Sequence, residues 1–165
     1  MLDPTDVYVQ AFTEAIKQST AYSGLSISFA LAAWLGGNAR AENAVTVPGV
    51  PVSLPPKTAQ QVLIAFAIGL GTMGLVAVDA AIRSSTFLQR YPDILAAACT
   101  TPGIASTSIG LRVGSAVLPL LLLCHVNWRH RKSVNTNWLI LTTTWTVLAF
   151  SALAMGLLRV KCRDV

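Results

Sequence analysis

Two charged residues, Asp79 and Arg112, stand in the apolar part of the chain, where a charge is costly. Such residues are candidates for an ion or proton pathway. A carboxylate paired with a guanidinium can equally act as a structural clasp, contact a partner subunit, or let the arginine reach the headgroups. If their helices pack as antiparallel neighbours, the spacing places Asp79 against Arg112. The same register brings Thr72 near Ser115.

Three glycines in the stretch 64–79 follow the pattern Gly69-x-Gly71-x-x-Gly74, which has the letters of a dinucleotide-binding turn. That turn requires a strand before it, a helix after it and further βα repeats. More apolar sequence of membrane length follows instead. We therefore interpret these glycines as sites of close helix contact and expect no cofactor.

The remaining residues with reactive or ligating side chains are few. His125 and His130 are five positions apart and do not share a helical face, so no metal site is predicted. Cys99, Cys124 and Cys162 are odd in number and show no paired spacing. Cys162 lies among basic residues just beyond an apolar stretch, which makes it a candidate for reversible palmitoylation.

Catalytic constellations are missing from the sequence. It contains no Ser-His-Asp set, no phosphate-binding loop, no H-E-x-x-H motif and no carboxylates at catalytic spacing. We therefore expect that the chain is not an enzyme by itself.

The composition indicates a membrane environment. Of 165 residues, 53% are hydrophobic and only 12% are charged, about half the charged fraction of a soluble domain. A helix needs roughly 20 apolar residues to cross the hydrocarbon core. The charge-free stretches approach or exceed that length, and they cover residues 18–39, 58–78, 94–111, 113–128 and 133–158. The sequence therefore predicts an all-α integral membrane protein.

We expect a single membrane domain over residues 1–165, built as a bundle of four transmembrane helices. The spans fall at about residues 20–36, 61–82, 106–126 and 138–158. An amphipathic helix over residues 3–18 either lies on the membrane surface or runs straight into the first span. A proline-rich loop covers residues 38–60. A short interfacial or re-entrant helix, beginning near Pro92, separates spans two and three.

The residues that flank the spans bear on orientation. Trp128 and Trp138 anchor the ends of a tight loop that holds Arg129, Arg131 and Lys132. The two ends of the chain and the loop after the second span carry six positive charges, and the loops on the other side of the membrane carry five, so the charges do not decide the orientation. The proline-rich loop tolerates translocation across the membrane, which favours termini on the cytoplasmic or matrix side. The net charge of +5 is interpreted as contact with anionic lipid, with no nucleic acid as a partner. The kind of membrane is left open.

Small residues form a seam on every predicted span and predict close helix packing. They are Ser19, Ser23, Ser26, Gly71, Gly74, Gly110, Gly114 and Gly156. Four such seams favour a non-catalytic subunit or scaffold of a multi-subunit membrane complex, with other membrane subunits or copies of itself as partners. The alternative is a homo-oligomeric channel or small transporter with Asp79 and Arg112 in or near its pathway. A subunit that completes a cofactor site with other chains is a third reading.

Overall fold

The structure is a computed structural model that describes residues 4–36, 45–46, 53–100, 102–103, 107–130 and 135–160. Within these residues the chain forms helices α1 (Pro4–Gly36), α2 (Pro56–Leu88), α3 (Pro92–Cys99), α4 (Ile109–His130) and α5 (Thr136–Arg159). Two short strands, β1 (Val45–Thr46) and β2 (Ser53–Leu54), pair antiparallel between α1 and α2. The all-helical prediction is confirmed, apart from this small pair.

Among the described residues, three helices are long and apolar enough to cross a membrane, namely α2, α4 up to Arg129, and α5. Helix α1 does not meet the same hydropathy criterion, because serines interrupt its C-terminal half. The protein is therefore helical with three candidate membrane-spanning helices, which is consistent with lipid contact and an integral membrane location.

The helix boundaries differ from the prediction in understandable ways. The amphipathic helix and the first predicted span form one continuous helix, α1, because no proline or glycine pair separates them. Helix α2 begins at Pro56, inside the predicted proline-rich loop, since a proline is favoured in the first turn. Residues 38–44 and 47–52 of that loop lie outside the described part of the chain. Helix α4 begins three residues later than expected, at Ile109.

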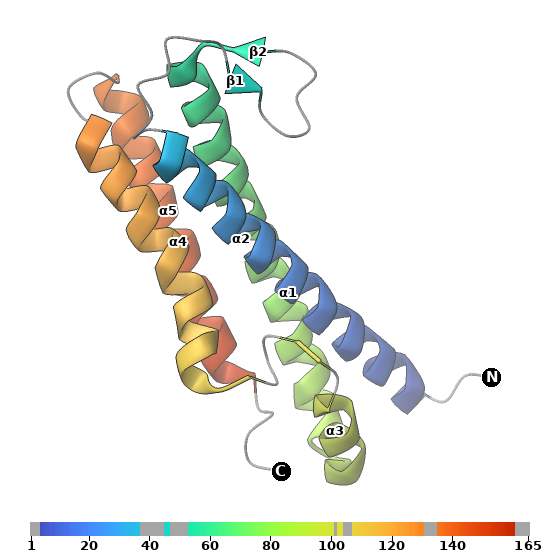
Figure 1. Ribbon diagram of the computed structural model, residues 1–165. Helices are drawn as coiled ribbons and strands as arrows, with labels where there is room; N and C mark the ends of the chain where they lie inside the picture. Colours follow the sequence, from blue (N-terminus) through green and yellow to red (C-terminus); the bar gives the residue numbers. More distant parts are fainter. Residues whose placement is uncertain are drawn as a thin grey trace.

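The four long helices alternate in direction and lie side by side (Figure 1). Helix α1 contacts α2 and α4, and α5 contacts the same two helices from the other side. Helices α2 and α4 therefore lie across a diagonal and barely touch. Their position matters because the sequence prediction treated them as neighbours.

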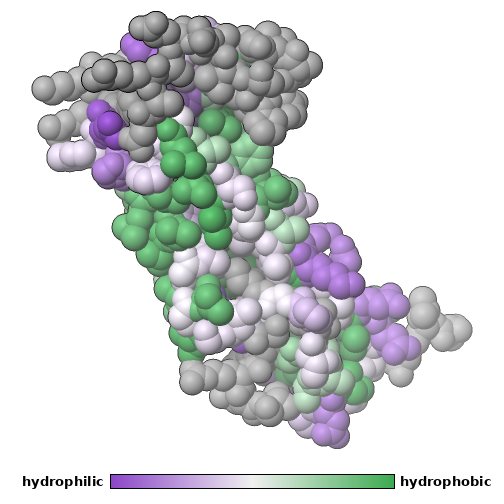
Figure 2. All heavy atoms as spheres, viewed as in Figure 1, coloured by the Kyte–Doolittle hydropathy of each residue, from purple (hydrophilic) through white to green (hydrophobic). Residues whose placement is uncertain are grey.

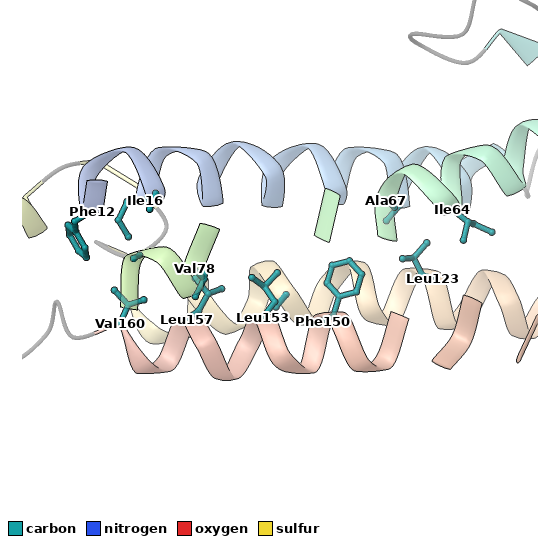
Figure 3. Packing of buried hydrophobic residues seen from close by; sticks show 14 of the residues in the cluster. Phe12, Ile16, Ile64, Ala67, Val78, Leu123, Phe150, Leu153, Leu157 and Val160 are labelled. Carbon is teal, nitrogen blue, oxygen red and sulfur yellow. The ribbon is translucent and has the colours of Figure 1, made fainter. Parts of the chain in front are cut away.

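The interior is filled by aliphatic and aromatic side chains between these helices. Phe150, Leu153 and Leu157 of α5 point across the interior toward the opposite helices (Figure 3). The first turns of α1 pack on the last turns of α2, where the Tyr8 and Phe87 rings stack with centroids 3.9 Å apart. The two longest helices, at about 1.5 Å per residue, are each about 50 Å long, so their paired ends extend beyond α4 and α5.

Small residues set the distance between the packed helices. A Cβ atom added at Gly71 would lie 2.6 Å from Phe150 Cζ, and one at Gly156 would lie 2.8 Å from Val78 Cγ1. Ser19, Ser23 and Ser26 of α1 are all buried. The Ser26 hydroxyl donates a hydrogen bond to the Ala67 carbonyl of α2 at 2.8 Å. These residues allow α2 to approach both α1 and α5 closely.

We expect Gly71→Leu to lower the free energy of unfolding by about 1–3 kcal/mol, because the new side chain would occupy the space of the Phe150 ring. Thermal unfolding in mild detergent measures the change. Gly69→Leu is the matched control, since a Cβ at Gly69 would meet nothing within 4 Å. Equal melting temperatures for the two variants would contradict the packing described above.

Candidate functional site

The structure does not pair Asp79 with Arg112. The Asp79 carboxylate instead binds Arg83, one turn further along α2, with Oδ2 and Nη2 2.7 Å apart. Both side chains are largely exposed, at 55% for Asp79 and 80% for Arg83. The predicted pair required α2 and α4 to be neighbours, and their diagonal placement prevents it. Thr72 and Ser115 likewise donate within their own helices, to the carbonyls of Ile68 and Arg112.

Arg112 joins the start of α4 to the end of α5. Its side chain is only 5% exposed. Nε donates to the Thr107 carbonyl at 2.9 Å, and Nη1 donates to the Val160 carbonyl at 3.3 Å. A cation at a helix C-terminus is favoured by the helix dipole and satisfies carbonyls that lack a partner within the helix. Arg112 thus acts as a clasp between the start of α4 and the end of α5, and these two carbonyl oxygens are among its partners.

A cavity of about 200 Å³ lies between α2 and α5, at the level of Asp79. Arg159, in the last turn of α5, also lines it. Its remaining lining residues are apolar or small, and they are Leu75, Val78, Ile82, Ala152, Met155 and Gly156. The Asp79 carboxylate and the Arg159 guanidinium therefore line an otherwise apolar recess, and Arg83 is linked to it through its ion pair with Asp79. Sequence reasoning missed Arg83 and Arg159, although the spacing of Asp79 and Arg83 is typical of a helical ion pair.

A second polar contact lies at the opposite end of α4 and α5. The buried Asn127 amide donates to the hydroxyls of Thr142 and Thr143, both at 3.2 Å. An amide that bonds across two helices stabilises their association in a membrane. The sequence prediction missed this contact, for which an asparagine inside an apolar helix was the available signal.

The predicted interface anchors fall near this same end of α4 and α5. Trp128 is 67% exposed, Arg129 is exposed, and Trp138 is half-buried. Arg131 and Lys132 lie outside the described residues.

The cysteines are in different states. Cys99, at the end of α3, is disulfide-bonded, and Cys124 is a free thiol. Cys162, the predicted lipidation site, lies outside the described residues. No group of three His, Cys, Asp or Glu side chains with metal-binding geometry occurs in the described ranges.

The predicted packing glycines divide into two groups. Gly71, Gly74 and Gly156 face neighbouring helices of the same chain. At Gly110 and Gly114, an added Cβ would meet no described atom within 4 Å outside its own helix. The α4 pair is therefore not used for packing among the described elements.

Comparison of the chain with protein-family models, curated proteins and solved structures finds no match. Function must therefore be argued from the chain's own residues.

We expect Arg112→Met to lower the free energy of unfolding by about 1–3 kcal/mol, because it removes charge-assisted hydrogen bonds from a buried guanidinium to the carbonyl groups of Thr107 and Val160. Thermal unfolding in detergent is the measurement. Arg83→Met, which removes an exposed ion pair, should change stability by less than about 1 kcal/mol. A larger loss for Arg83→Met than for Arg112→Met would be inconsistent with the clasp.

Proposed function

We propose that the protein is a non-catalytic membrane subunit or scaffold that binds another membrane helix through the Gly110–Gly114 face of α4. The unpacked state of these two glycines is the observation that carries the proposal. Glycines four residues apart let a second helix approach closely enough for extensive van der Waals contact and weak Cα–H···O contacts. Gly71 and Gly74 of α2 and Gly156 of α5 already lie against side chains of neighbouring helices, whereas the Gly110–Gly114 pair of α4 does not.

Helix α1 is proposed as a fourth span. Residues 18–36 carry no charge, and this segment runs beside the charge-free part of α2. Its outward side chains include the exposed Leu25, Leu31 and Leu35. Three of its four serines, Ser19, Ser23 and Ser26, are buried, and Ser26 bonds to α2, so much of the low hydropathy of α1 arises from its buried side. On the visible face of the molecule, hydrophobic and neutral residues fill much of the middle, while hydrophilic residues gather toward the upper end and along the N-terminal part of α1 (Figure 2).

We expect Gly110→Leu and Gly114→Leu to abolish association while leaving the fold intact, because the added side chains keep the partner helix at a distance. Native mass spectrometry of the gently extracted protein measures the bound chains, and thermal unfolding checks the fold. Gly24→Leu is the control, since it adds the same side chain to an open position of α1.

Two results would contradict the proposal. One is unchanged association in both α4 variants, and the other is a wild-type protein that carries no partner chain. Chains of other proteins that remain bound to the extracted protein support the subunit role, whereas a homo-oligomer alone favours the channel or transporter alternative.

We propose an orientation on the basis of the bonded state of Cys99. Helix α3, the start of α1 and the end of α5 lie at the same end of the molecule (Figure 1). Disulfides persist in oxidising compartments, whereas the cytosol keeps thiols reduced. The bonded state of Cys99 therefore supports placing this end, with the start of α1 and the end of α5, on the non-cytoplasmic side. This proposal reverses the orientation favoured by the sequence.

Fusions at the C-terminus in a bacterial host test the orientation. We expect alkaline phosphatase, which requires an oxidising compartment, to be active, and green fluorescent protein to be dark. Fluorescent and phosphatase-inactive fusions would place the termini in the cytoplasm instead.

A further inference from the structure

The cavity between α2 and α5 lies where the apolar part of α2 ends. Residues 58–78 carry no charge and cover about 32 Å at 1.5 Å per residue, close to the thickness of the hydrocarbon core. Asp79 ends this stretch and lines the cavity. Arg159, also at the cavity, ends the long apolar helix α5. The charged end of the cavity therefore lies at the depth where lipid headgroups begin.

The positive charges near the cavity outnumber the negative ones. Asp79 is bound to Arg83, so one cation of the group is neutralised. Among the described residues, no acidic side chain pairs with Arg159. The group of Asp79, Arg83 and Arg159 keeps one net positive charge beside an apolar recess.

The chemistry of this recess matches that of a phospholipid. A guanidinium presents donors in a planar fork that suits two oxygens of a phosphate group. Leu75, Val78 and Met155 supply apolar walls on the membrane side of the charges.

We propose that the cavity between α2 and α5 binds the phosphate headgroup of one anionic phospholipid. Arg159 and Arg83 bind the phosphate oxygens, and the acyl chains lie along the apolar walls. Asp79 holds Arg83 in place and competes with the phosphate for it. The net positive charge selects an anionic lipid over a zwitterionic one. The proposal depends on a membrane location and not on the subunit role.

Native mass spectrometry in a neutral detergent tests this site with phosphatidylglycerol and phosphatidylcholine as probes. We expect the wild type to bind phosphatidylglycerol more tightly, and Arg159→Gln to weaken that binding about tenfold through loss of a charge-assisted contact. Asp79→Asn should tighten it a few-fold, because Arg83 loses its competing partner. A gain in binding cannot arise from misfolding.

Matched controls separate this site from general electrostatics. Arg90→Gln and Asp93→Asn make the same changes in net charge at exposed positions outside the cavity. Both should leave phosphatidylglycerol binding close to that of the wild type. The proposal is overturned if Arg90→Gln weakens binding as much as Arg159→Gln, if Asp79→Asn fails to tighten it, or if the two lipids bind equally well.

Discussion

The close approach of α2 to its two neighbours, α1 and α5, is the constraint on which the rest of the structure depends. In a bilayer, burial of apolar side chains provides little drive for helices to associate, because lipid tails are equally apolar. Association then requires close contact and hydrogen bonds between helices. Gly71 accepts the Phe150 ring and Gly156 accepts Val78, while Ser26 bonds to the Ala67 carbonyl. Larger residues at these positions would separate the helices and break that bond.

This constraint explains the positions of the other features. With α1 and α5 on either side of α2, helix α4 takes the diagonal position and leaves Gly110 and Gly114 without a described neighbour. Asp79 and Arg112 consequently have other partners. Asp79 binds Arg83, and Arg112 binds the carbonyl groups of Thr107 and Val160. Two residues that suggest a pathway by type and depth are held apart by the arrangement of the helices.

The sequence predicted those parts of the fold that depend on one helix at a time. Charge-free stretches located α2, α4 and α5, because the length of an apolar helix follows directly from its sequence. Small-residue spacing located the packed faces at Ser26, Gly71 and Gly156, because the helical period determines which residues share one face of a helix. The helical period does not show which helices are neighbours, so the predicted pairing of Asp79 with Arg112 was wrong. The cavity at Arg159 and the disulfide at Cys99 could not be predicted because each depends on segments that only the folded chain brings together.

Our central proposal is that α1 crosses the membrane with Ser19, Ser23 and Ser26 packed toward the interior. Power-saturation electron paramagnetic resonance in liposomes tests this proposal, with single spin labels at Leu25 and Leu31, which are both exposed on α1. The account predicts high accessibility to oxygen and low accessibility to a water-soluble nickel reagent at Leu25 and Leu31. A label at Glu14, in the N-terminal half of α1, should show low accessibility to oxygen and high accessibility to the nickel reagent. Nickel accessibility at Leu25 and Leu31 as high as that at Glu14 would place α1 in water and contradict the account.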